Sequence, residues 1–183
     1  MDLNRLLVLF YRLPPELITL GFLLMSLVLA WLFRLLRQHR PLRPALLCVT
    51  LLWAAVVVDI TVLSRSPAAA QSPALIPLHS YREVLNGGNP ELLRSNYMNA
   101  ALFFPAGLLA RSLLPDGKSP GRPLLWAMLA FACFSACIEL CQCSLALGTP
   151  EIDDVIHNSL GALSGWLCFH GALTVLEHQA AFS

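Results

Sequence analysis

The chain has 183 residues, and only 13% of them are charged, about half the share of a soluble domain. The formal net charge of +1 provides no bulk attraction for nucleic acid, so we expect no nucleic-acid partner. Hydrophobic residues make up 57% of the chain and fall in long runs, which excludes an ordinary soluble core and predicts a polytopic membrane protein.

Five apolar runs each approach the length of about 20 residues that a membrane-spanning helix needs. The sequence therefore predicts an all-α fold, a polytopic transmembrane helix bundle of about five spans. In chain order the runs cover residues 17–33, 45–63, 97–114, 124–147 and 155–176.

The runs also predict how the chain is organised. Residues 1–44 should hold an N-terminal segment, the first span and a basic link, with the first 15 residues lying at the membrane surface as a short amphipathic helix. Residues 45–177 should form the main membrane domain, and residues 178–183 a C-terminal tail.

Basic residues in the links predict the orientation of the spans. The link after the first run carries four arginines and no acid, and the link after the third run, taken with the end of that run, carries Arg111, Lys118 and Arg122. Both links should face the cytoplasm, which puts the N-terminus outside and the C-terminus inside. The connection 64–96 then lies outside, where its prolines and glycines predict an irregular extracytoplasmic loop with a short helix near HSYREVL.

Polar side chains concentrate toward the outer ends of the predicted spans. Glu139 lies 15 residues after the start of the fourth run. At 1.5 Å per residue that is about 22 Å from the cytoplasmic end, in the outer third of a hydrocarbon core roughly 30 Å thick. Asp59 has a similar depth in the second run. The same level should also hold Arg65, Asn99, Asp153, Asp154 and Asn158.

Helical spacing predicts which of these side chains meet. Glu139 and Gln142 share one face of the fourth run with Ser135, and Asp154 and Asn158 share one face of the fifth. We expect the two polar faces to touch, with Glu139 within about 10 Å of Asn158. Two glycines four residues apart, Gly161 and Gly165, should let another backbone approach the fifth helix closely.

Other conspicuous residues are expected to serve in packing. Cysteines recur every fourth residue around Cys137, opposite the polar face, so they cannot pair with one another and should be packing residues. The spacing around His157 matches no standard metal site, and we expect neither a metal nor another cofactor. Pro105 and Gly107 predict a kink that opens space between helices.

Arg65, at the outer end of the second run, should supply a counter-charge for these acids. Its planar fork suits a carboxylate or a phosphate, so we expect it to point inward and pair with Glu139 or Asp154 when no ligand is present. Structural alternatives stay open. Glu139 could form a permanent ion pair, and Glu151 and Asp153 could be helix-start residues favoured by the helix dipole.

Three motifs in series resemble the VanZ-like membrane proteins of bacteria. The segments NAALFFPAGLL (99–109), SACIELCQ (135–142) and EIDDVIHNSLGALSG (151–165) match the patterns Asn-x-x-x-Phe-x-Pro-x-Gly, Ser-x-x-x-Glu-x-x-Gln and Asp-Asp-x-x-x-Asn-x-x-Gly. The elements LSR and LIPL fit as well. Two groups found in many members are missing here, an arginine shortly before the Asp-Asp pair and an asparagine where this chain has Ala74.

The resemblance implies an envelope-related protein of the bacterial cytoplasmic membrane, since the founding member of the family is tied to resistance against the glycopeptide teicoplanin. We expect a polar pocket open to the outer leaflet that binds, or also modifies, a lipid-linked or surface ligand. Whether the protein is an enzyme stays open. In an enzyme, Glu139 and Asp154 would be the catalytic carboxylates. The ligand-binding residues would be Arg65, Asn99, Gln142, Asp153 and Asn158.

Two further function classes stay open. A transporter is disfavoured because the inner halves of the runs are nearly devoid of polar residues and no inverted repeat is visible. A structural or partner-binding membrane protein would use the polar residues only to lock its helices together. The expected partners are the lipid bilayer and either a lipid-linked envelope precursor or other membrane proteins.

Overall fold

A computed structural model describes residues 12–36, 42–67, 74–114 and 121–181 of the chain. Apart from one isolated β-bridge, the regular structure of these residues is helical, so the predicted all-α fold is confirmed. Most of the predicted N-terminal amphipathic segment and part of the basic link lie outside the described residues. The elements are α2 (Pro15–Leu36), α3 (Leu42–Val58), the π-helix η1 (Asp59–Leu63), α4 (His79–Leu85), α5 (Glu91–Ser112), α6 (Gly121–Ser144) and α7 (Ile152–Ala181).

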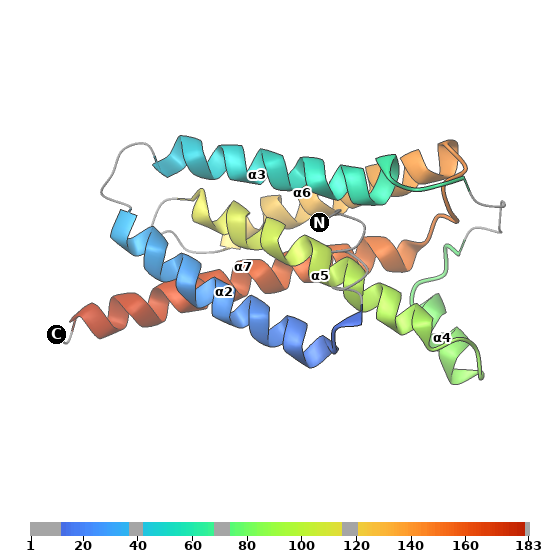
Figure 1. Cartoon of the computed structure of the whole chain (residues 1–183), viewed down its shortest axis with the longest axis horizontal. Helices are drawn as coiled ribbons and strands as arrows, with labels where there is room; N and C mark the ends of the chain where they lie inside the picture. The colour runs from blue at the N-terminus through green and yellow to red at the C-terminus, as the bar shows by residue number, and fades with distance from the viewer. Residues whose placement is uncertain (1–11, 37–41, 68–73, 115–120, 182–183) are drawn as a thin grey trace.

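The long helices run back and forth along the molecule (Figure 1). α3 and α6 end where the short helix α4 lies and where α5 and α7 begin, and we call this the α4 end. α5 and α7 run from there to the opposite end, near the C-terminus. The helix at HSYREVL is present as predicted, and it is α4.

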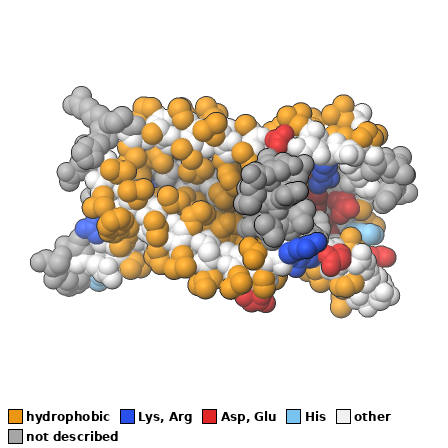
Figure 2. Space-filling model, in the orientation of Figure 1, with side chains coloured by type: hydrophobic (Ala, Val, Ile, Leu, Met, Phe, Trp, Pro, Cys, Tyr) orange, Lys and Arg blue, Asp and Glu red, His pale blue; other side chains and the backbone are white. Residues whose placement is uncertain are grey.

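Among the described residues, four helices are long and apolar enough to cross a membrane: Pro15–Leu36, Leu42–Leu63, Gly121–Ser144 and Ile152–Gln179. The expected third span, α5, is not among them, because Asn96, Asn99 and Arg111 interrupt its apolar sequence. α5 nevertheless runs along the middle of the bundle (Figure 1). A helix that neighbouring helices surround does not need the continuous apolar surface of one that faces lipid. The outer helices do present that surface, as the mostly hydrophobic face in Figure 2 shows.

Three glycines let α5 and α7 pack backbone against backbone. A Cβ atom at Gly107, Gly161 or Gly165 would collide with a carbonyl group of the facing helix. The close approach predicted at Gly161 and Gly165 is confirmed, and its partner is α5. Gly107 does not open space as expected, because it lies in this contact. The carbonyl groups concerned belong to Ala162, Ala100 and Phe104, in that order.

Arg111 departs from its expected place in a cytoplasmic link. It lies in α5 and is buried against α7, where its Nε is 3.4 Å from Nδ1 of His170. Its Nη1 is buried without a hydrogen-bond partner among the described residues. The end of the bundle opposite α4 is therefore less apolar than the sequence indicates.

Candidate functional site

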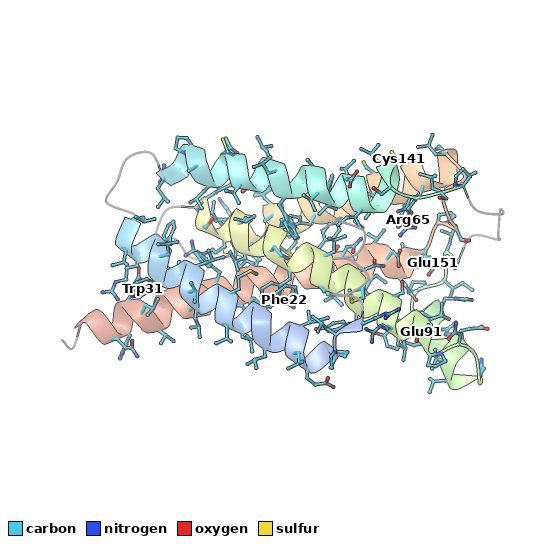
Figure 3. The ribbon with its side chains drawn as sticks, viewed as in Figure 1. Phe22, Trp31, Arg65, Glu91, Cys141 and Glu151 are labelled. Atoms are coloured by element: carbon cyan, nitrogen blue, oxygen red, sulfur yellow. The ribbon has the colours of Figure 1, made fainter. Side chains whose placement is uncertain are left out.

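Charged side chains gather at the α4 end, as the depths of the polar residues predict. Figure 2 shows acidic, basic and histidine side chains together at this end. Figure 3 places Arg65, which follows η1, near Glu151, which precedes α7. Beneath them, a hydrophobic cluster that includes Phe103 and Ile138 joins α5 to α6. The polar groups therefore lie on an apolar floor.

Glu139 lies at the point where α6 meets the beginning of α7. It is 7% exposed, and its Oε2 accepts a hydrogen bond of 3.0 Å from the backbone N–H of Glu151. Backbone N–H groups at a helix N-terminus lack partners within the helix, and they carry the positive end of the helix dipole. The Glu139 carboxylate therefore occupies a position that favours negative charge. Cys137 lies away from this face of α6, as predicted, but it is exposed rather than packed within the bundle.

The polar faces of α6 and α7 touch, as predicted. Nδ2 of Asn158 donates a hydrogen bond of 2.8 Å to Oγ of Ser135, which lies one helical turn before Glu139. Asn158 is only 4% exposed, and its Oδ1 has no hydrogen-bond partner within the described residues. One half of this buried amide therefore holds the two helices together and the other half is unsatisfied.

Asp154 and Asn99 form the side of the site between α7 and α5. The half-buried carboxyl group of Asp154 lies in the fields of Glu139 and Glu151, which repel it, and of Arg65, which attracts it. The Asn99 side chain lies beside the same carboxyl group. Nδ2 of Asn99 is nevertheless buried without a partner at hydrogen-bond distance in the described part of the chain.

Arg65 lies at the exposed edge of this group. Its Nη1 reaches the α6–α7 link, 3.3 Å from the position that a Cβ atom at Gly148 would occupy. Its charge attracts Glu139, Glu151 and Asp154. The expected direct ion pair is not formed with any acid that the structure describes. The α7 terminus already stabilises Glu139, and an exposed guanidinium avoids the desolvation that a buried pair would require.

Asp153 serves a different part of the structure from its neighbour Asp154. It is 2% exposed and accepts hydrogen bonds from the backbone N–H groups of Leu78 and Ser80 and from Oγ of Ser80. Leu78 has a φ of 60°, a left-handed conformation that is unfavourable for leucine. Asn96 of α5 donates to the same Ser80 Oγ at 2.6 Å. Asp153 thus ties α4 to α7, and through Ser80 to α5.

Gln142 also makes a contact within the protein. Its Nε2 donates a hydrogen bond of 2.8 Å to the backbone carbonyl of Thr61 in η1. A π-helical turn shifts the hydrogen-bond pattern of a helix and often occurs near functional sites. Gln142 fixes this turn against α6, a few residues before Arg65.

His157 and Tyr81 form a second connection between α7 and α4. Nδ1 of His157 lies 2.6 Å from the carbonyl oxygen of Asp153, so this nitrogen donates. Nε2 then accepts from the Tyr81 hydroxyl at 2.9 Å, and the two rings stack with centroids 5.7 Å apart. Sequence reasoning missed Ser80 and Tyr81, because a short polar helix in a loop carries no signal for the partner it meets.

The comparison with protein families bears on the segment that carries these contacts. The VanZ/LLP1 family model matches residues 42–175. The chain belongs to the VanZ/LLP1 family. The matched VanZ/LLP1 region runs from the start of α3 into α7 and includes every site residue described above. No curated protein and no solved structure matches the chain.

Glu151 gains importance in the VanZ/LLP1 region, although the sequence pointed only to a helix-start role. Burial and the neighbouring charge of Asp153 raise the pKa of Glu151, while His79 and Arg65 act in the opposite direction. No three His, Cys, Asp or Glu side chains of the described residues are arranged to hold a metal ion. For this VanZ/LLP1 chain we define the polar site as Arg65, Asn99, Glu139, Glu151, Asp154 and Asn158.

Proposed function

We propose that this VanZ/LLP1 protein crosses the bacterial cytoplasmic membrane five times and uses the polar site to bind the headgroup of a lipid-linked or surface ligand. The buried amide of Asn158 supports the proposal. Its Oδ1 lies near a group of carboxylates and has no hydrogen-bond partner among the described residues. Buried polar atoms are normally paired, so a polar ligand that donates to this oxygen would remove an energetic penalty.

The six residues of the polar site would then contact the ligand, with the planar fork of Arg65 on its phosphate. Gln142 and Asp153 would act as positioning residues, because their hydrogen bonds hold η1 and α4 in place. If a reaction follows binding, Glu139 and Asp154 are the carboxyl groups available for proton transfer. An envelope role of this kind includes protection against teicoplanin-type glycopeptides.

The test uses the purified protein in a maltoside detergent, which contains no phosphate. Phosphatidylglycerol is titrated in and bound lipid is counted by native mass spectrometry. Arg65→Lys keeps the charge and loses the fork, so the affinity should fall by about tenfold. Arg82→Lys, at an exposed arginine of α4, is the matched control and should bind like the wild type. Unchanged binding by a folded Arg65→Lys protein would contradict the proposal.

A structural role is the second candidate, and specific contacts favour it. Glu139 caps α7, and Asn158 joins α7 to α6 through Ser135. Glu139→Gln separates the two candidates, because glutamine has the same shape and can still accept from the Glu151 amide. A changed lipid affinity at an unchanged unfolding temperature indicates a binding site. Lost folding with intact binding in the surviving fraction indicates a helix lock.

A further inference from the structure

We propose that the ligand of the polar site is a zwitterion, with a primary ammonium group that the carboxylates hold and a phosphate that Arg65 holds. This is the chemistry of a phosphoethanolamine headgroup. The inference rests on the proposed function of the same site and names its ligand class. Two observations support it: the charges of the site and the buried amide of Asn158, whose Oδ1 has no partner among the described residues.

The polar site has an excess of negative charge. Three carboxyl groups, Glu139, Glu151 and Asp154, face one arginine, so the fully ionised site carries 1 − 3 = −2. A ligand that brought only a phosphate would satisfy Arg65 and increase this excess. A ligand that also brings a positive charge compensates the carboxylates, which is most valuable where water is scarce.

The arrangement of acceptors favours an ammonium group over a metal ion. The described acids do not form a group of three that could hold a metal ion. Glu139 already uses one oxygen for the Glu151 amide, and Asp154 approaches from α7 beside Asn99. Acceptors that are spread over several directions suit a primary ammonium, which carries three N–H donors.

Asn158 supplies an independent observation. It is buried one turn after Asp154 on α7 and is bonded to α6 one turn before Glu139, so its amide lies beneath both acids. Its Oδ1 is an acceptor without a partner among the described residues. A donor that entered between the acids would meet this atom.

The position of Arg65 determines how the ligand is oriented in the site. The arginine is exposed beside the α6–α7 link, whereas Glu139 and Asn158 are buried. The phosphate should therefore bind at the exposed edge and the ammonium group deeper in the site. A quaternary ammonium group has no N–H donor and should be a poor replacement.

The test compares three lipids with matched chains in maltoside: phosphatidylethanolamine, phosphatidylcholine and phosphatidylglycerol. Native mass spectrometry should show phosphatidylethanolamine binding about tenfold more tightly than the other two, because only it offers N–H donors to buried acceptors. Glu151→Gln should remove this preference by weakening the binding of phosphatidylethanolamine. Glu83→Gln, at an exposed acid of α4, is the matched control and should keep the preference.

The outcomes separate this inference from the proposed function. If phosphatidylglycerol binds as tightly as phosphatidylethanolamine and Arg65→Lys still weakens it, the zwitterion is wrong and the anion site stands. If Arg65→Lys affects no lipid, both are wrong. Competition with soluble phosphoethanolamine shows whether the natural headgroup must be part of a lipid. Competition at millimolar concentration indicates a free headgroup as a sufficient ligand, and failure to compete indicates a lipid. The order of the three lipid affinities of the wild-type protein tests the inference even if a variant does not fold.

Discussion

Asp153 and Asp154 are adjacent in the chain and point to different surroundings, because successive residues of a helix are about 100° apart. Asp153 faces α4 and is saturated with hydrogen bonds, whereas Asp154 faces the other carboxylates. The pair therefore combines a residue that holds the structure with one that is available for a ligand.

Replacement of Asp153 by alanine tests the first of these roles. It leaves the two buried donors of Ser80 and the partly buried N–H of Leu78 unpaired, so the free energy of unfolding should fall by about 3 kcal/mol. Thermal unfolding in detergent measures the change. Asp59→Ala is the control, since it loses a single hydrogen bond of 3.2 Å from Ser64 and should change the stability much less. Equal effects of the two substitutions would contradict the role of Asp153.

Glu151 should make the stability depend on pH. Burial and Asp153 raise its pKa in the folded protein, against the opposing charges of His79 and Arg65. The folded state therefore binds the proton more tightly than the unfolded state. Stability from this group is lost as the pH rises from the ordinary pKa of a glutamate through the raised value. Glu151→Gln should raise the unfolding temperature at pH 7.5 and leave it nearly unchanged at pH 4. A gain at pH 4 alone would contradict this account.

The sequence predicted the depth at which these residues lie along the bundle more accurately than it predicted which residues they contact. The level follows from the fixed rise of a helix, and the face follows from its period. The partner of Asp153 depends on the path of the loop before α4, which no periodic pattern encodes. The ion pair expected between Arg65 and Glu139 is absent for the same reason. The backbone N–H that donates to Glu139 belongs to Glu151, in the link between α6 and α7.

At the level of helices, the contact between α5 and α7 explains where the side chains of the site lie. Ala100 meets Gly161. Asn99, next to Ala100, and Asn158, three residues before Gly161, belong to the polar site. Small residues at a helix interface let backbones approach to distances that any side chain would prevent. Hydropathy alone identified the outer helices and gave a weaker signal for α5, since residues that neighbouring helices cover need not be uniformly apolar.

Single methyl groups should disrupt this contact. Gly161→Ala and Gly165→Ala force a Cβ atom into a backbone carbonyl of α5, which should lower the free energy of unfolding by about 3 kcal/mol. Gly171→Ala, in the same helix with open space around it, should be neutral or slightly stabilising because alanine favours helix formation. Unfolding temperatures of the three variants measure the difference. A Gly161→Ala protein as stable as Gly171→Ala would show that the helices are farther apart.

At the level of the whole molecule, the back-and-forth course of the long helices leads us to expect five crossings (Figure 1). They are the four long apolar helices and, in addition, α5. Five crossings put the two termini on opposite sides of the membrane, whereas four put them on the same side. A fluorescent-protein fusion after Ser183 should fluoresce, which indicates a cytoplasmic C-terminus. An alkaline phosphatase insertion at Gly87 should be active outside the cytoplasm. Gly87 and the C-terminus on the same side would mean that α5 does not cross the membrane.

The glycine contact between α5 and α7 also has a genetic consequence. It sets the width between Asn99 on one helix and Asp154 on the other, although the glycines themselves offer no polar atom to a ligand. In a library of random substitutions scored for growth, loss-of-function alleles should therefore cluster at Gly107, Gly161 and Gly165 as densely as at the acids. The positions that do not tolerate substitution would then follow the small residues of the contact along the bundle and would be most frequent at the polar site.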